Sequence, residues 1–341
     1  MSAKPASSIA AAVTGELPAP PPLVRALEAA TSADGVAALD PDVPAHVWQA
    51  ALVGPAAELL ARPGKDLRAR LVEAGCALAG GTPDATTHAI ARVLEILHAG
   101  SLIVDDVEDQ SEVRRGEPAL HKLVGEPLAI NTGSWMYFWA LGELARLALP
   151  GATELAVATL VRCHQGQALD LATRVTALDV RQVSAVVRAT TRLKTGALCR
   201  LAVELGALAA GASPTVRAAI GELGEIAGCA LQMLDDLGCL VAPARRDKAY
   251  EDLRAARPTW PWAWLAQAHE PFVWARLVAH ASAATELPAL ADALAAQVEP
   301  LGRRAIGDTI ERALAAVRPH APVSIVEAIA ADLRRMEAMY G

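Results

Sequence analysis

From about residue 45 onward, apolar residues recur every three or four positions, the spacing that places them on one face of an α-helix. Alanine and leucine, both strong helix formers, dominate these segments. Glycine and proline interrupt the pattern at intervals that suit helices of about 12 to 25 residues. The breaks lie at residues 63–64, 80–84, 125–127, 150–152, 211–214 and 316–322. Segments with the strict alternation of β-strands are missing, so the pattern predicts an all-α fold of about ten or more packed helices.

The first 22 residues differ from the rest of the chain. They contain one lysine and a weak alanine-rich stretch, which has too little apolar character for a secretory signal. Prolines at positions 18, 20, 21 and 22 should stop any helix there. We therefore expect a flexible N-terminal arm over residues 1–22 and a single all-α domain over residues 23–341.

Charge and cysteine content narrow the functional classes. The net charge of -7 and the pI near 5.7 argue against a nucleic-acid partner, because no broad basic surface is available to neutralise phosphates. The five cysteines are odd in number and form no CxxC pair, which is typical of reduced thiols in a cytoplasmic protein. The most apolar later window, residues 197–212, is interrupted by Arg200 and Glu204, so we expect no transmembrane segment.

An apolar helical run ends abruptly in a cluster of carboxylates, formed by Asp105, Asp106, Glu108 and Asp109. Asp105 and Asp109 are four residues apart, so on a helix they point the same way and repel each other. Such an arrangement needs a positive partner, either a hard divalent cation or a basic group. Ligands that are all oxygen favour Mg²⁺ over zinc or copper.

A second acidic cluster, Asp235 and Asp236, follows another apolar helical run about 130 residues later and is preceded by Gln232. Facing each other across a cavity of a helical bundle, the two clusters could hold several Mg²⁺ ions, whose open positions phosphate oxygens commonly fill. The cations that would complete a diphosphate site are also present. They are Lys65, Arg68, Arg114, Arg115, Lys194, Lys248 and Arg257.

These residues give the chain a resemblance to the trans-isoprenyl diphosphate synthases, or polyprenyl synthetases, and in particular to geranylgeranyl diphosphate synthases. The resemblance covers roughly residues 50–265 and rests on seven landmarks in the family's order. They are GKDLR at 64–68, HAGSLIVDDVED at 98–109, RRGEPALH at 114–121, GQALD at 166–170, KTG at 194–196, LQMLDD at 231–236 and EDLRAARPTWP at 251–261. An isolated acidic pair would be weak evidence, whereas seven ordered landmarks are specific.

The resemblance implies the isoprenoid synthase bundle, with helices around a central cavity, and a transferase that condenses isopentenyl diphosphate with an allylic diphosphate. It implies several Mg²⁺ ions per site, with Mn²⁺ as a substitute, and a homodimer. Mg²⁺ and basic side chains would stabilise the charge on the departing diphosphate. No separate base is needed, because in the family the released diphosphate is the favoured proton acceptor.

Carried over residue by residue, the resemblance assigns a role to each polar residue of the landmarks. The catalytic set would be Asp105, Asp106, Asp109, Arg114, Lys194, Thr195, Gln232 and Asp235. Of these, the Mg²⁺ ligands would be Asp105, Asp109 and Asp235. The allylic diphosphate would lie among Arg114, Lys194, Gln232, Lys248 and Arg257. Isopentenyl diphosphate would be held by Lys65, Arg68, His98 and Arg115. Oxygens of Thr195 and Gln167 would steady the cation, with Asp170 as a supporting neighbour.

The second acidic motif departs from the family pattern. It reads DDLGC, so Cys239 stands where the family usually has a third carboxylate. A thiol is a poor ligand for a hard cation, so we expect Mg²⁺ to bind at Asp235 less tightly than in relatives with the full motif.

Product length can be argued from steric bulk on the helix that leads to Asp105. Residues four and five positions earlier lie one turn back, along the wall that would receive the growing chain, and they are Ser101 and Gly100. Both are small, so the wall is open there and the floor must come from elsewhere, for which the aromatic run 135–139 is a candidate. We expect a C20 product, geranylgeranyl diphosphate, with C15 or C25 and longer products as alternatives.

Two other functional classes remain compatible with the residues. One is an atypical enzyme on the same scaffold, either a terpene cyclase or a transferase to an unusual acceptor. A cyclase would have no use for the residues assigned to isopentenyl diphosphate, all of which are present, namely Lys65, Arg68, His98 and Arg115. The other class is a catalytically impaired regulatory subunit, suggested by Cys239.

Overall fold

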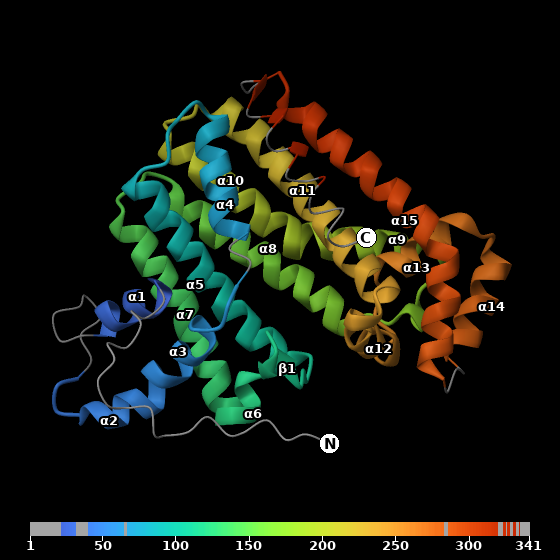
Figure 1. The fold of residues 1–341 in the computed structure, drawn as a ribbon, viewed down its shortest axis with the longest axis horizontal. Helices are drawn as coiled ribbons and strands as arrows, with labels where there is room; N and C mark the ends of the chain where they lie inside the picture. The colour runs from blue at the N-terminus through green and yellow to red at the C-terminus, as the bar shows by residue number, and fades with distance from the viewer. Residues whose placement is uncertain are drawn as a thin grey trace. The chain divides into compact units, whose positions relative to one another are not determined.

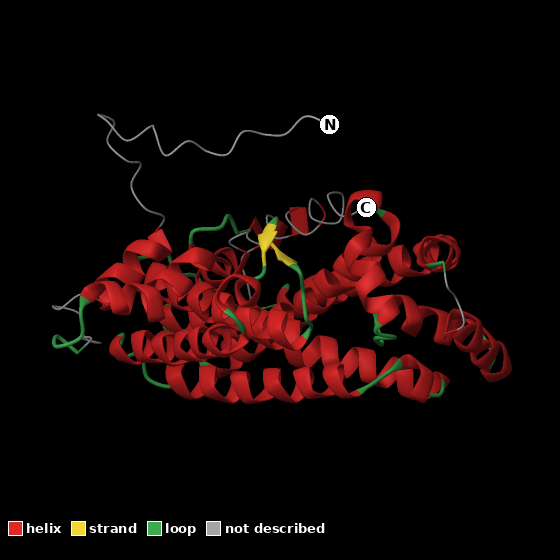
Figure 2. Cartoon of the chain, turned by 90° about the horizontal axis from the view of Figure 1, so that it is seen from below, coloured by secondary structure: helices red, strands yellow, loops and turns green. Residues whose placement is uncertain are grey.

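The predicted helical pattern is confirmed in a computed structural model that describes residues 22–31, 40–64, 67–282 and 286–319, and residues 323, 324, 326, 327, 330, 331 and 334. Over these residues the chain is nearly all helix, with one short β-hairpin (Figures 1 and 2). Residues 1–21, most of the expected arm, lie outside the described residues. Pro22 was expected to stop a helix but is the first residue of α1 (Pro22–Thr31), because proline is tolerated in a first helical turn.

The chain divides into two compact units. The first consists of residues 1–64 and 99–134, and the second consists of residues 65–98 and 135–341. Two long helices, α5 (Ala85–Glu108) and α7 (Glu126–Arg146), contribute residues to both units. The expectation of a single domain therefore stays a prediction, and each unit is described by itself.

Besides the end of α5, the first unit contains several short helices. They are α2 (Ala45–Trp48), the π-helix η1 (Gln49–Val53), α3 (Gly54–Leu60) and α6 (Leu120–Val124). Helices α1 and α6 both pack against α3. Leu27, Leu59 and Leu120, one from each of these helices, are fully buried. Burial of one apolar stripe per helix is what the sequence pattern predicts.

The hairpin of the first unit was not expected from the sequence. Its strands β1 (Val113–Arg114) and β2 (Glu117–Pro118) pair antiparallel, with Val113 opposite Pro118. The turn residues Arg115 and Gly116 have φ angles of 53° and 83°. Two-residue hairpin turns require such left-handed conformations, which glycine adopts readily and arginine does not. Strands of two residues carry no alternation pattern, so the periodicity could not reveal them.

The second unit is a bundle built around the 28-residue helix α11 (Pro214–Val241), which packs against both α10 and α15 (Figure 1). The other helices before α11 are α4 (Leu67–Leu78), α8 (Ala152–Ala172), α9 (Val180–Thr191) and α10 (Ala197–Ala209). Those after it are α12 (Arg246–Arg254), α13 (Trp260–Ala268), α14 (Pro271–Ser282) and α15 (Leu287–Val317). Single turns connect some of them, namely η2 (Val175–Ala177), η3 (Arg192–Gly196) and η4 (Pro243–Arg245).

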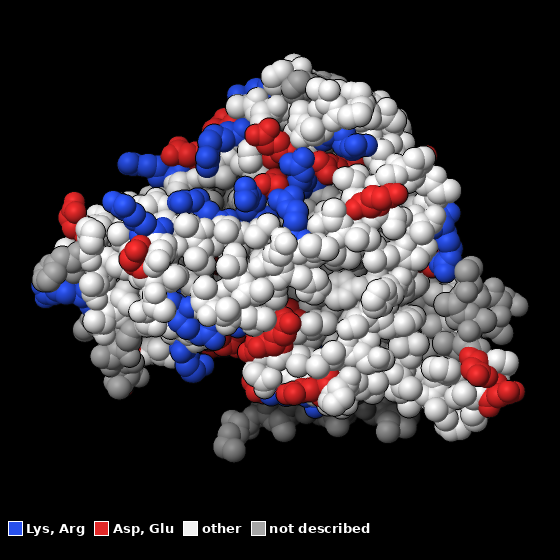
Figure 3. All heavy atoms as spheres, turned by 180° about the vertical axis from the view of Figure 1, so that it is seen from behind, with Lys and Arg blue, Asp and Glu red and all other residues white. Residues whose placement is uncertain are grey.

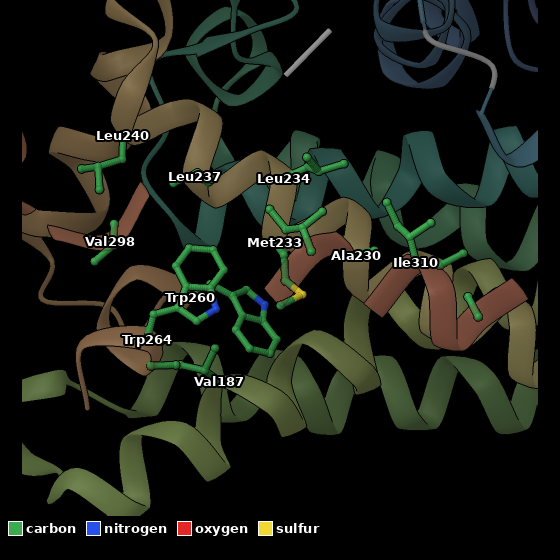
Figure 4. Close-up of a cluster of buried hydrophobic side chains, with 14 of the residues drawn as sticks. Val187, Ala230, Met233, Leu234, Leu237, Leu240, Trp260, Trp264, Val298 and Ile310 are labelled. Atoms are coloured by element: carbon green, nitrogen blue, oxygen red, sulfur yellow. The ribbon is translucent and has the colours of Figure 1, made fainter. Parts of the chain in front are cut away.

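The core of the second unit lies between α9, α11, α13 and α15 (Figure 4). Trp260 and Trp264 of α13 lie in it with ring centroids 5.9 Å apart, beside Val187 and Val298. The indole of Trp260 donates a hydrogen bond to Thr191 Oγ1 at 2.9 Å, which satisfies its buried N–H. These tryptophans are therefore packing anchors.

Helices α4 and α10 approach so closely that their backbones touch. A Cβ atom added to Gly206 would lie 1.9 Å from the carbonyl oxygen of Val72, and one added to Gly75 would lie 2.1 Å from that of Val203. Only glycine fits at such distances. This reciprocal contact fixes α4, whose first turn carries Arg68, against the bundle.

By length and composition, helix α5 is apolar enough to cross a membrane, because an 18-residue stretch of it has a mean hydropathy of 1.2. Helices α11 and α12, which are bent by 97° at their junction, are also long and apolar enough when taken together. In α5, however, 61% of this 18-residue stretch is buried inside the protein, which is typical of a core helix. These helices are therefore weak evidence for a membrane span.

Charged residues of both signs are mixed on the surface. On the face shown in Figure 3, Lys and Arg side chains lie among Asp and Glu side chains. In the second unit, Glu225 pairs with Arg162 at 3.2 Å and with Arg200 at 3.7 Å. The described residues of this face therefore present basic and acidic side chains together.

Candidate functional site

The first acidic cluster lies at the C-terminal end of α5, in the first unit. The N–H of Asp109 donates to the carbonyl of Asp105 at 2.8 Å, so both carboxylates lie on one face of the last turn. Both side chains are partly exposed. Helix α5 then ends in a Schellman motif, in which Gln110 has a φ of 53° and the N–H of Ser111 bonds to the carbonyl of Asp106 at 2.9 Å. The sequence therefore stops the helix directly after the two carboxylates.

Asp106 lies between these two residues in the sequence, but its side chain is buried. It is only 1% exposed, and both of its carboxylate oxygens accept from Arg114 Nε, at 2.8 and 3.0 Å. Burial by itself would lower the pKa of the Arg114 guanidinium, but the hydrogen bond and charge of Asp106 outweigh it and raise that pKa. Arg114 also lies 3.7 Å from Asp105. The carboxylate of Asp106 thus holds Arg114 in place beside the predicted metal ligand.

The hairpin carries both predicted arginines of the first unit. Arg114 ends β1, and Arg115 occupies the first position of the turn. The guanidinium of Arg115 donates to the carbonyl of Arg62 at 3.1 Å. Arg62 was not predicted from the sequence, and its contacts show that it belongs to this group.

In the second unit, Asp170 joins two predicted diphosphate ligands. Its carboxylate lies 2.7 Å from Lys194 Nζ and 3.5 Å from Arg257 Nη1. Lys194 belongs to the π-helix η3, a rare element found frequently at functional sites. A Cβ at Gly166 would lie 3.1 Å from the N atom of Lys194, so glycine allows α8 to approach η3 this closely. Asp170 thus contacts both cations, while the supporting role expected of it in substrate binding stays a prediction.

A line of hydrogen bonds extends from η3 across α11. The hydroxyl of Thr195 donates to Gln232 Oε1 at 2.7 Å, and Gln232 Nε2 donates to Asp236 at 2.8 Å. Asp236 also accepts from the backbone N–H of Trp260 at 3.0 Å. Burial raises the pKa of the Asp236 carboxyl to about 7, although both hydrogen bonds oppose the shift. Asp236 therefore acts as a partly buried acceptor that orients Gln232 and the start of α13.

Asp235, the predicted Mg²⁺ ligand of the second cluster, has a cationic partner that the sequence did not reveal. Its carboxylate lies 2.5 Å from Arg245 Nη2, and 45% of its side chain is exposed. Cys239, one turn later, is buried, and burial raises the pKa of its thiol to about 12. At neutral pH Cys239 is thus an uncharged thiol, in agreement with its expected inertness toward a hard cation.

The remaining predicted residues are distributed over several elements. Lys248 lies on α12, 3.5 Å from Asp252 and 3.7 Å from Glu251. His98 and Gln167 are half-buried on α5 and α8. Arg68 has a pKa lowered chiefly by burial, partly offset by Glu95 and by neighbouring thiols. Lys65 lies outside the described residues.

The small residues of α5 have a packing reason in addition to the predicted one. A Cβ at Gly133 of α7 would lie 2.8 Å from the carbonyl oxygen of Gly100, so the two helices nearly touch there. Ser101 is half-buried on the next position of α5. In the aromatic run, Met136 and Trp139 are buried while Phe138 is 73% exposed. Whether any of these residues limits product length stays a prediction.

The predicted Mg²⁺ site can be tested against the donors present. In the part of the chain that the structure describes, no three His, Cys, Asp or Glu side chains lie together as a ready metal site. Asp105 and Asp109 nevertheless supply partly exposed carboxylate oxygens from one helical turn, which suit a hard divalent cation. Asp235 belongs to the other compact unit, so its joining the same ions stays a prediction.

Comparisons with known proteins agree with these landmarks. Residues 49–290 match the model of the family described as polyprenyl synthetase. Geranylgeranyl pyrophosphate synthase 2 of Zymoseptoria tritici is 36% identical over 188 residues, which are 54% of this chain and 54% of that protein. Copalyl diphosphate synthase of Talaromyces verruculosus is 31% identical over 215 residues, which are 62% of this chain and 21% of that protein. The chain thus spans about half the length of the first relative and about a fifth of the second.

The fold has close counterparts among solved structures. The decaprenyl diphosphate synthase from Rhodobacter capsulatus superposes with a TM-score of 0.75 at 21% identity, covering 94% of this chain and 95% of that one. At this identity the likeness establishes the fold, which is the helical isoprenoid synthase bundle expected from the sequence. The family model covers most of the chain, from before α3 to the start of α15. The chain belongs to the polyprenyl synthetase family.

Proposed function

We propose that this protein is a Mg²⁺-dependent prenyltransferase that joins isopentenyl diphosphate to an allylic diphosphate, with geranylgeranyl diphosphate (C20) as its product. One observation carries the proposal. Lys194, with Arg257, is held on Asp170, and the adjacent Thr195 is bonded to Gln232, so three of the residues assigned to the allylic diphosphate lie in one group in the second unit. The names of the related geranylgeranyl pyrophosphate synthases support the same reaction.

In the proposed mechanism, basic side chains bind the diphosphate and stabilise its departure. Lys194 and Arg257 would exchange Asp170 for diphosphate oxygens. In the first unit, Arg114 would bind diphosphate oxygens while Asp106 keeps its guanidinium oriented. When bound at Asp105 and Asp109, Mg²⁺ would neutralise further charge on the leaving group. The allylic C–O bond would break, and the oxygens assigned to steady the resulting cation are those of Thr195 and Gln167. The double bond of isopentenyl diphosphate then forms the new C–C bond, and a proton passes to the released diphosphate.

One observation favours a second candidate, an impaired regulatory subunit. The second acidic motif lacks its third carboxylate, and Asp235 is already paired with Arg245. A chain of this kind would bind substrates weakly or need a partner subunit for turnover. It would nevertheless keep the same fold.

Product identification separates the candidates. The purified chain is incubated with Mg²⁺, labelled isopentenyl diphosphate and a C5, C10 or C15 allylic diphosphate in turn. An elongated diphosphate, identified by mass, is the expected result. Hydrocarbon or a prenylated acceptor would instead indicate an atypical enzyme, and no product without a second chain would indicate the regulatory subunit.

Product length gives a more specific prediction at Ser101. Replacing Ser101 by phenylalanine adds a ring one turn before Asp105 and should narrow the proposed chain-binding wall, so the main product should shift from C20 to C15. Chromatography of the dephosphorylated products measures the shift. Ser101→Ala is the matched control and should leave the product unchanged. An unaltered product from Ser101→Phe would refute the wall argument.

We further propose that the protein is a cytoplasmic homodimer. The support for the dimer is apolar surface on α7 and α8, where Phe138, Val157 and Val161 are 73%, 44% and 54% exposed. Val157 and Val161 are four residues apart and so share a face of α8. The support for the location is that none of the five cysteines forms a disulfide. Analytical ultracentrifugation should give twice the mass of 35.5 kDa, and a monomer mass would contradict the dimer.

A further inference from the structure

Arg62 is a buried cation that the proposed mechanism does not use. It follows α3 in the first unit, and only 5% of its side chain is exposed. Its Nη1 donates to the carbonyl oxygen of Arg114 at 2.9 Å, and its Nη2 donates to that of Pro118 at 3.0 Å. Glu58, one turn back on α3, accepts from Nη2 at 3.1 Å and neutralises the charge. One guanidinium thus bridges the two strands of the hairpin.

The hairpin needs such an anchor. A two-stranded hairpin of this length is not stable by itself in water. Arg115 in its turn has a φ of 53°, which is unfavourable for any residue with a Cβ and persists only where the surroundings hold it. The backbone carbonyls that Arg62 binds lie on either side of this turn. The contacts are therefore placed where they oppose opening of the hairpin.

Arg62 and the hairpin bind each other reciprocally. Arg62 binds the carbonyl of Arg114, and its own carbonyl accepts from the Arg115 guanidinium at 3.1 Å. Burying a cation is costly, and the Nε of Arg62 is buried without a hydrogen-bond partner in the described contacts. Its two terminal nitrogens are nevertheless bonded to the carbonyls of Arg114 and Pro118 and to Glu58, so this buried charge holds the hairpin.

We propose that Arg62 is a positioning residue, which anchors the Val113–Pro118 hairpin to α3 so that Arg114 and Arg115 are presented to the diphosphates. The proposal rests on the proposed function only for the identity of the ligand. The guanidinium geometry is essential, because its two terminal nitrogens reach two carbonyls at once. A lysine ammonium is a single point charge and could hold only one of them well.

The test compares Arg62→Met and Arg62→Lys with the matched control Lys122→Met. Lys122 pairs with Glu112 at 2.8 Å just beside the hairpin, but on the surface, with 34% and 75% of the two side chains exposed. Hydrogen exchange of a peptide covering residues 113–119 should become at least about tenfold faster in Arg62→Met, because two bonds to a charged donor are lost. Arg62→Lys should give an intermediate rate, and Lys122→Met should match the wild type.

Enzyme kinetics then test positioning against a purely structural role. We expect the KM values of both diphosphates to rise about tenfold or more in Arg62→Met, with a smaller fall in kcat, and partial recovery in Arg62→Lys. Loss of folded protein would lower kcat alone. Unchanged hairpin exchange, or faster exchange with unchanged KM in an active enzyme, would overturn the proposal. If the wild type itself makes no product, the proposed function fails. The anchor can then still be tested by direct binding of inorganic diphosphate. Equal affinity in the wild type and Arg62→Met would overturn the proposal.

Discussion

Replacing Asp105 by asparagine is expected to lower kcat/KM of the proposed prenyl transfer roughly a thousandfold, because a Mg²⁺ ligand beside the leaving diphosphate contributes several kcal/mol of charge stabilisation. The side chain is only partly buried at the last turn of α5 and lies outside the apolar core, so its replacement should leave the core intact. The fold, measured by thermal unfolding, should remain within a few degrees of the wild type. Activity should recover in part at high Mg²⁺ concentration, because Asp109 remains as a ligand.

Two neighbours on the same helix provide controls. Glu108→Gln changes one exposed carboxylate that the mechanism does not use, and it should leave kcat/KM within about twofold. Asp106→Asn acts through Arg114, which loses its charged partner, so it should raise KM without changing the dependence on Mg²⁺. Equal losses in all three variants would show that the cluster is a general electrostatic feature and not a metal site.

Among substitutions that add a single methyl group to the second unit, Gly206→Ala should lower the free energy of unfolding most. Its Cβ would lie 1.9 Å from the carbonyl oxygen of Val72, and that backbone atom cannot move unless α4 and α10 separate. Overpacking usually costs about 1–3 kcal/mol, and we expect the upper end of that range or more, even after the roughly 1 kcal/mol by which alanine favours a helix. Thermal unfolding monitored by circular dichroism should show a midpoint lowered by about 5 °C or more.

Gly307→Ala is the matched control for this variant. Gly307 lies inside α15, and among the described residues no atom outside its own stretch of helix lies within 4 Å of the position that a Cβ would take, so alanine adds no clash. Its unfolding midpoint should stay the same or rise slightly, because alanine favours the helix by about 0.5–1 kcal/mol. If both variants unfolded at the same temperature, the close approach of α4 and α10 would not exist in solution.

The fold was predictable because its main signal is local. Apolar spacing of three and four marks the helices, and the glycine and proline breaks mark most of their ends. What periodicity could not show depends on single backbone conformations. The hairpin depends on Arg115 in a left-handed conformation, and the exact end of α5 depends on Gln110 in the same conformation, where glycine is usual.

The sequence identified many residues of the candidate site, but it did not show which of them contact each other. The ordered landmarks led to Lys194, Thr195 and Gln232, which the structure joins to Asp170 and Asp236. Arg62 and Arg245 were missed, because each contacts groups that sequence spacing does not relate to it. Arg62 binds backbone carbonyls more than 50 residues away, and these have no side-chain signature. Asp106 was found, but only its hydrogen bonds show that it holds Arg114.

The carboxylate shared by Lys194 and Arg257 affects how tightly the proposed site could retain its products. An incoming diphosphate must compete with Asp170 for both cations, so its binding energy is the difference between two ion-paired states and not the full attraction of bare charges. The same carboxylate can recapture the cations when diphosphate departs. Pyrophosphate should therefore leave quickly after each condensation, because Asp170 competes with it for Lys194 and Arg257.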